Sequence, residues 1–265
     1  MTGNPLALAT PEQIASRKKE RLFVYGKGTG DGKGIICVTD SRGQPKHEWR
    51  SEVAEVVRRA SGDPRTEIVV DASEGFIPLW DEDVTLRWRF NEVSMQAFAE
   101  PEAAKTAIEA LFYEAVDRWD IGCPVKFERD EARYDFEIVM RSQARCSLNG
   151  CVLASAFFPD GGQHELVLYP SMFEQPREEQ LETLVHEIGH VFGLRHFFAL
   201  IGEQDWPAII YGQHKKFSIM NYGVDSKLTD ADKSDLRDLY DKVWSREISA
   251  LNGTRVELMR PYSSQ

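Results

Sequence analysis

Three closely spaced histidines restrict the fold of this chain more than any other feature of the sequence. Residues 186–196 read His-Glu-Ile-Gly-His-Val-Phe-Gly-Leu-Arg-His. His186 and His190 are four residues apart, so on a helix they lie one turn apart on the same face. His196 is too far along the chain to share that face, so the helix has to end and the chain has to turn. Gly193 lies where the turn is needed, and glycine tolerates positive φ angles at the end of a helix.

This arrangement of imidazoles predicts a catalytic zinc site. Two imidazoles one helical turn apart can bind one zinc ion at ~2.0–2.1 Å. With His196 as a third ligand, the fourth coordination position stays open to water or substrate, which is typical of a catalytic zinc. Glu187 adjoins His186 and can point toward that position as a general base. The expected number of chance matches to three histidines, one acid and one glycine at these spacings is below about one in ten thousand.

The pattern His-Glu-x-x-His-x-x-Gly-x-x-His resembles the signature of the metzincin clan of zinc peptidases. That clan also has a methionine-containing turn beneath the metal, and residues 218–223, Ser-Ile-Met-Asn-Tyr-Gly, look like this turn. The resemblance implies that Met220 packs under the imidazoles as a hydrophobic floor. It also implies that Tyr222 binds zinc and swings away to stabilise the tetrahedral intermediate, as in the astacin-like and serralysin-like branches.

A second segment resembles a different branch of the clan. Residues 153–159, Leu-Ala-Ser-Ala-Phe-Phe-Pro, are similar to the matrixin edge strand, whose backbone pairs with extended substrate. The resemblance assigns this pairing to Leu153, Ala154 and Ser155. Matrixins place a ligand of a second zinc in this strand, a histidine where this chain has Ser155, so one catalytic zinc ion is expected. Because the strand and Tyr222 favour different branches, the prediction stops at the clan.

The resemblance covers about residues 76–244 and implies an α+β, zincin-like fold. Such a fold has a twisted, mostly parallel sheet with an antiparallel edge strand, an active-site helix and a C-terminal helix. The hydrophobic pattern independently predicts secondary structure in this region. Strands are expected at 84–90, 125–127, 136–140, 152–157 and 166–169, and helices at 101–119, from 176 and from 229. Thr229 and Asp232 are expected to form a capping box on the last helix.

The first part of the chain differs in character, so residues 1–70 are assigned to an N-terminal region and residues 71–265 to the catalytic domain. The N-terminal region is expected to hold helices at 11–21 and 51–60, and strands at 22–25, 35–38 and 67–70. Residues 26–34 form a glycine-rich loop. In a nucleotide-binding loop Ser or Thr follows Gly-Lys, but here Gly34 follows Lys33, so a flexible turn is favoured.

Whether the N-terminal region blocks the metal is left open by the sequence. The matrixin pro-segment does so with a cysteine in a Pro-Arg-Cys-Gly type motif, which the surroundings of Cys37 do not match. An aspartate can play the same part, and Asp40, Asp63 and Asp71 are not ranked. A docking element, or a part of the same core, are the alternatives for this region.

The remaining bulk features limit the partners. The net charge of -11 argues against nucleic acid or an anionic membrane. No apolar run approaches the ~18 residues that a membrane span needs. The N-terminus does not resemble a signal peptide, so the compartment is left open between retention, another export route and a removed leader. Cys146 and Cys151 flank a turn-forming stretch, where a disulfide loop and free thiols are about equally expected.

Together these features predict a zinc-dependent endopeptidase that acts on protein or peptide substrates. The alternative from another class is a zinc-bearing binding module that has lost turnover. A monomer is assumed, and a requirement for calcium, the substrate and its preferred side chains are not predicted.

Overall fold

The computed structural model describes residues 4–10, 12–13, 67–72, 75–147, 150–196, 208–212, 219–220 and 227–265. Of the elements predicted in the N-terminal region, those between residues 14 and 66 lie outside the described residues, and so does the glycine-rich loop. The predicted strand at 67–70 is present as β1 (Glu67–Asp71). The boundary between residues 70 and 71 falls within this strand and stays a prediction.

The centre of the fold is a five-stranded sheet with the order β4-β3-β5-β9-β8. Four strands are parallel, and β8 runs antiparallel to β9 at one edge. The strands are β3 (Thr85–Phe90), β4 (Lys126–Arg129), β5 (Phe136–Met140), β8 (Ala154–Ser155) and β9 (His164–Leu168). This mixed sheet, together with the helices, confirms the α+β metzincin-type fold.

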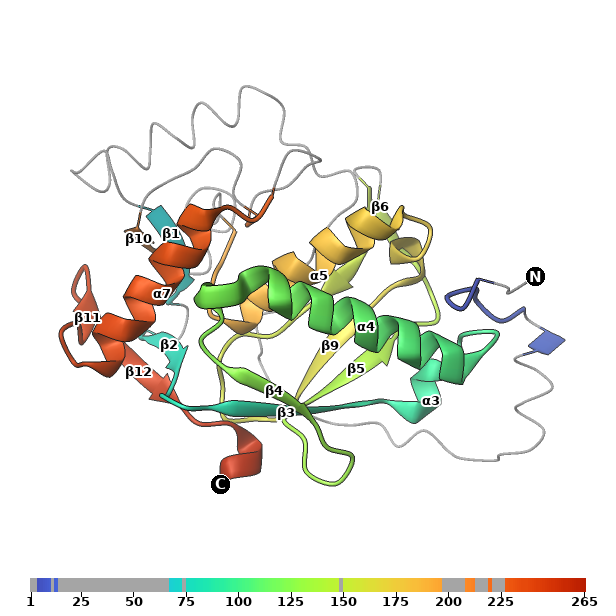
Figure 1. The fold of residues 1–265 in the computed structure, drawn as a ribbon, viewed down its shortest axis with the longest axis horizontal. Coiled ribbons are helices and arrows are strands. Elements are labelled where there is room, and N and C mark those ends of the chain that lie inside the picture. Colours follow the sequence, from blue (N-terminus) through green and yellow to red (C-terminus); the bar gives the residue numbers. More distant parts are fainter. Residues whose placement is uncertain are drawn as a thin grey trace.

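Two long helices lie next to each other over the sheet, as Figure 1 shows for α4 and α5. They span Pro101–Trp119 and Arg177–Val191. The predicted apolar face of α4 is buried, and its members are Ala104, Ile108, Leu111, Phe112, Ala115 and Trp119. A third helix, α7 (Asp230–Trp244), begins with the predicted capping box, in which Thr229 and Asp232 bond to each other's backbone N–H. None of the helices in the described parts of the chain combines the length and apolar composition that a membrane span requires.

Several shorter elements surround this core. A two-stranded sheet pairs β1 with β10 (Ala208–Gly212), and a three-stranded sheet has the order β11-β12-β2. The remaining short elements are α3 (Glu92–Met95), β2 (Ile77–Trp80), β6 (Arg145–Ser147), β7 (Gly150–Val152), β11 (Ala250–Leu251), β12 (Thr254–Met259), η1 (Asp120–Gly122), η2 (Pro170–Met172) and η3 (Tyr262–Ser264). In Figure 1 the two small sheets lie beside α7.

The predicted strand at 152–157 is wrong in its extent. Val152 ends the β6–β7 hairpin, and β8 contains only Ala154 and Ser155. Between them, the carbonyl oxygen of Leu153 accepts a hydrogen bond from Tyr169 N at 2.9 Å. A continuous apolar run is compatible with both arrangements, because its residues are buried in either case. In the hairpin Cys151 is disulfide-bonded, and the backbone register sets Cys146 opposite it.

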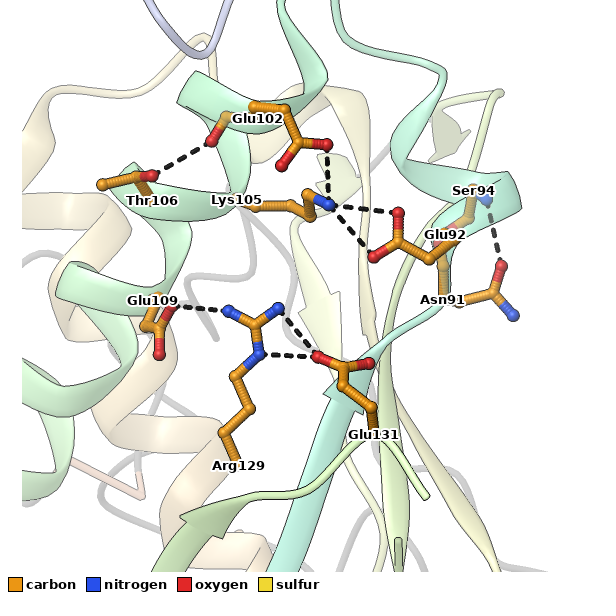
Figure 2. Close-up of polar contacts among 9 residues, drawn as sticks. All are labelled: Asn91, Glu92, Ser94, Glu102, Lys105, Thr106, Glu109, Arg129 and Glu131. Atoms are coloured by element: carbon orange, nitrogen blue, oxygen red, sulfur yellow. Dashed lines mark hydrogen bonds and ion pairs between the residues drawn. The ribbon is translucent and has the colours of Figure 1, made fainter. Parts of the chain in front are cut away.

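Charged side chains attach α4 to the sheet edge and to α3, as Figure 2 shows. The Lys105 ammonium lies 3.0 Å from Glu92 and 2.8 Å from Glu102. Arg129, on the edge strand β4, bonds Glu109 of α4 at 2.9 Å and Glu131 at 2.8 Å. Arg129 and Glu109 thus link α4 to the sheet edge, and Lys105 and Glu92 link it to α3.

Candidate metal centre

Helix α5 carries the first half of the candidate site. It begins after Pro176 and places His186, Glu187 and His190 in the interior, at 3%, 0% and 0% exposure. Burial of three polar side chains on one helix is unusual, because polar groups lose hydration inside a protein. A ligand or a set of hydrogen bonds therefore has to stabilise them.

The helix ends in the turn that the sequence predicts. Gly193 has φ +88°. Its N–H donates to the His190 carbonyl at 2.8 Å, and the Leu194 N–H donates to the Gly189 carbonyl at 3.0 Å. These two bonds form a Schellman cap, which reverses the chain and satisfies carbonyl groups at the end of the helix. The turn brings His196, which is fully buried, back toward the helix.

The three histidines converge on one point. His186 Nε2 lies 3.1 Å from Nε2 of both His190 and His196, and one ligand atom from each lies within 4.8 Å of the others. The opposite ring nitrogens face carbonyl oxygens: Nδ1 of His186 donates to Ile219 at 2.7 Å and Nδ1 of His190 donates to Leu194 at 2.6 Å. The N–H groups are thus turned outward, and the Nε2 lone pairs of these two rings are turned inward.

This donor set fits zinc. Two nitrogens bound at ~2.0–2.1 Å to one tetrahedral zinc are ~3.3 Å apart, close to the 3.1 Å in the structure. Burial, followed by the neighbouring rings of His186 and His196, lowers the pKa of His190 well below its ordinary value. A neutral imidazole is the form that binds a metal. Among the described residues, His186, His190 and His196 form the group of side chains that could hold a metal ion.

Residues 219–220 contact helix α5 at His186 and Gly189. A Cβ added to Gly189 would lie 2.6 Å from Met220 Sδ and 3.1 Å from Trp119 Cζ2. A larger residue between the two helical histidines would therefore displace Met220, which packs against the helix there together with Trp119. The Ile219 carbonyl, one residue before Met220, orients His186. Tyr222 lies outside the described residues.

Side chains distant in sequence complete the end of α5. Trp80 Nε1 donates to the Val191 carbonyl at 2.7 Å, and the Tyr240 hydroxyl donates to the Phe192 carbonyl at 3.2 Å. Both carbonyls belong to the end of the helix, where they have no partner within it. Sequence reasoning did not predict this role for Trp80 or Tyr240.

The predicted substrate strand lies beside the histidines. Phe158, three residues after β8, packs edge-on against His190 with ring centroids 5.5 Å apart. Leu153, Ala154 and Ser155 are buried at 2%, 0% and 2% exposure. The structure thus brings β8 near the site, with the backbone of these residues out of contact with solvent.

Known proteins share sequence or structural features with this chain. The matrixin family model matches residues 80–241. Myroilysin is a similar solved structure, with 12% identity and a TM-score of 0.40 over 65% of this chain and 98% of that one. High choriolytic enzyme 1, a hatching enzyme zinc-protease from the medaka fish Oryzias latipes, has 14% identity and a TM-score of 0.35 over 62% and 94%. Neither likeness adds to the family match at these values. None of the curated proteins matches the chain.

The family match covers more than half of the chain and contains the five-stranded sheet, α4 and α5. The sequence motifs pointed to different branches of the clan, and the family match favours the matrixin branch. The chain therefore belongs to the matrixin family of zinc metalloproteases.

Proposed function

We propose that the protein is an endopeptidase in which His186, His190 and His196 hold a single catalytic zinc ion. The observation that carries the proposal is the convergence of three buried Nε2 atoms, two of them 3.1 Å from the third. The carbonyl partners of His186 and His190 support it, because they fix the tautomer in which Nε2 is free to bind a cation. Ser155, which replaces the histidine of a second zinc site, supports one ion rather than two.

Zinc, when bound, lowers the pKa of a coordinated water toward ~7 and polarises the carbonyl group of the substrate. Glu187 would accept the proton from the attacking water and deliver it to the leaving amine. Its burial on α5 next to His186 supports this role. A carboxylate shielded from solvent does not lose the proton to bulk water before it transfers it to the leaving amine. Tyr222 would donate a hydrogen bond to the developing oxyanion, and Met220 would serve as the hydrophobic floor.

The substrate would be a protein or peptide that pairs in extended form with Leu153, Ala154 and Ser155. The position of β8 at the edge of the sheet, with Phe158 against His190, supports this path. Because the three residues are buried, their free edge has to become accessible before a peptide can pair with it.

The test is cleavage of a peptide library read by mass spectrometry, before and after zinc removal by a chelator. Internal cleavage that stops on chelation and returns with zinc is the expected result. Glu187→Gln should bind zinc normally but lose at least ~100-fold in turnover, since a positioned general base contributes about 10²–10⁴-fold. The matched control is Glu178→Gln, which removes an exposed carboxylate from the first turn of the same helix and should leave turnover unchanged.

The outcomes separate the candidate functions. Zinc binding without any cleavage would favour the binding module over the enzyme. Full turnover by Glu187→Gln would remove Glu187 from the mechanism. Cleavage only at chain ends would replace the endopeptidase with an exopeptidase.

A further inference from the structure

Strand β1 lies against the turn that presents His196. The Asp71 N–H donates to the Gly193 carbonyl at 3.0 Å, and Val70 forms an antiparallel bridge with Leu194. Leu194 is also the residue whose carbonyl orients His190. The backbone of β1 therefore holds the same short segment that fixes two of the three histidines.

A buried ion pair reinforces this contact. Arg195 lies between Leu194 and His196 in sequence, and its side chain is 1% exposed. Its Nη1 atom lies 3.5 Å from Asp71 Oδ1, and the Asp71 side chain is 3% exposed. The Arg195 guanidinium also lies 5.9 Å from the centre of the Phe158 ring, which packs on His190. Arg195 thus lies between Asp71 of β1 and the Phe158 ring that packs on His190.

The charge of this pair matters for a cation site. A buried guanidinium next to a zinc ligand repels a divalent cation, and the repulsion is strong where water does not screen it. The Asp71 carboxylate offsets that charge. Removal of one partner from a buried pair disturbs the surroundings far more than loss of a surface pair.

We infer that Asp71 and Arg195 are positioning residues for the zinc site, and that β1 is part of the metal-binding unit. β1 precedes residues 80–241, which match the matrixin family model, so this support is an addition to the matched region. Asp71 was one of the aspartates considered as a block on the metal. In the structure it contacts Arg195, and the inference gives it a supporting role.

The inference rests on the proposed zinc site, and the test separates the two. Zinc affinity of the full chain is measured by competition with a chromogenic chelator for the unmodified protein and for Asp71→Asn. The expected loss is roughly 10–100-fold, the range for residues that orient metal ligands. Asp241→Asn is the matched control: it removes the same charge from a half-exposed pair with Arg237, 2.9 Å apart, and should keep affinity within about twofold.

The conservative variants add a readout that loss of stability alone does not give. Arg195→Lys keeps the charge opposite Asp71 and should retain most of the affinity. Arg195→Met should lose affinity although it removes a repulsive charge, because the turn loses its side-chain contact with β1. Wild-type affinity in folded Asp71→Asn would overturn the inference while leaving the zinc site intact. Failure of the unmodified protein to bind zinc would overturn the proposed function, and the inference with it.

If Asp71→Asn does not fold, hydrogen exchange of the unmodified protein decides. Because coupling between two sites is reciprocal, bound zinc should stabilise the contact between β1 and the turn after α5 by as much as this contact increases zinc affinity. The Asp71 amide should exchange at least ~10-fold more slowly with zinc than without it. The Asp81 amide, which donates to the Met259 carbonyl at 2.9 Å in another strand pair, should respond less. Equal zinc effects on the two amides would overturn the inference.

Discussion

Replacement of Gly193 by alanine tests whether the turn after α5 needs both a special backbone conformation and free space. Gly193 has φ +88°, and an added Cβ would lie 3.1 Å from the Pro78 carbonyl oxygen and 3.2 Å from Leu79 Cδ2. Gly253 has a similar φ of +84°, but nothing lies within 4 Å of its added Cβ. The two substitutions therefore share the conformational strain and differ in crowding.

The expected losses of unfolding free energy follow from these contacts. Both variants lose about 1–2 kcal/mol of unfolding free energy, because the left-handed region is unfavourable for an L-residue with a Cβ atom. Gly193→Ala loses a further 1–3 kcal/mol or so, because the Pro78 carbonyl is backbone and yields little to the new methyl group. The totals are about 2–5 kcal/mol for Gly193→Ala and about 1–2 kcal/mol for Gly253→Ala.

Calorimetry of the zinc-free proteins measures the difference, since each kcal/mol lowers the melting temperature by roughly 2–4 °C in a domain of this size. Zinc affinity provides the second readout. It should fall for Gly193→Ala, whose turn sets the Leu194 carbonyl and His196, and stay constant for Gly253→Ala. Equal melting temperatures would refute the crowding argument, and unchanged zinc affinity in Gly193→Ala would refute the link between the turn and the histidines.

Other predictions concern groups outside the site. Burial, and then a hydrogen bond with Asp238, raises the pKa of Tyr211 from 10.0 to about 12. Its stabilising contribution should be complete below pH 10.0 and lost as the pH rises through about 12, so the stability difference between wild type and Tyr211→Phe should shrink there. Asp135→Asn should lose about 1–3 kcal/mol in urea unfolding, because the Asp135 carboxylate accepts from N and Oγ of Ser263 at 2.6 and 3.0 Å; an unchanged value would exclude this anchor. Burial raises the pKa of the Cys123 thiol to about 11, so thiol reagents should label it at neutral pH only after unfolding.

The local parts of the fold could be predicted from the sequence because their signals are local. The helix at 101–119 has the predicted bounds. Its apolar residues recur at spacings of three and four over a segment that is too long for a strand. The capping box at Thr229 is formed within four residues. The turn at Gly193 is also a local feature. His190 and His196 can meet at one point only if the helix ends and the chain turns between them.

Long-range partners could not be predicted from the sequence. Trp80 reaches Val191 across 111 positions, and no local pattern marks an indole N–H as the cap of a distant helix. The pairing of Asp71 with Arg195 spans 124 positions, and either residue alone is an ordinary charged side chain. In the apolar stretch after Val152, the short β8 pairs with β9, and the Tyr169 N–H donates to the Leu153 carbonyl in the same register; the sequence does not encode this pairing locally.

The most direct test of the account is the position and number of zinc ions in crystals of the full chain, located from anomalous scattering at the zinc absorption edge. We expect one ion per chain, ~2.0–2.1 Å from Nε2 of His186, His190 and His196. An ion bound elsewhere, a second ion of equal occupancy, or three histidines without metal in excess zinc would contradict it.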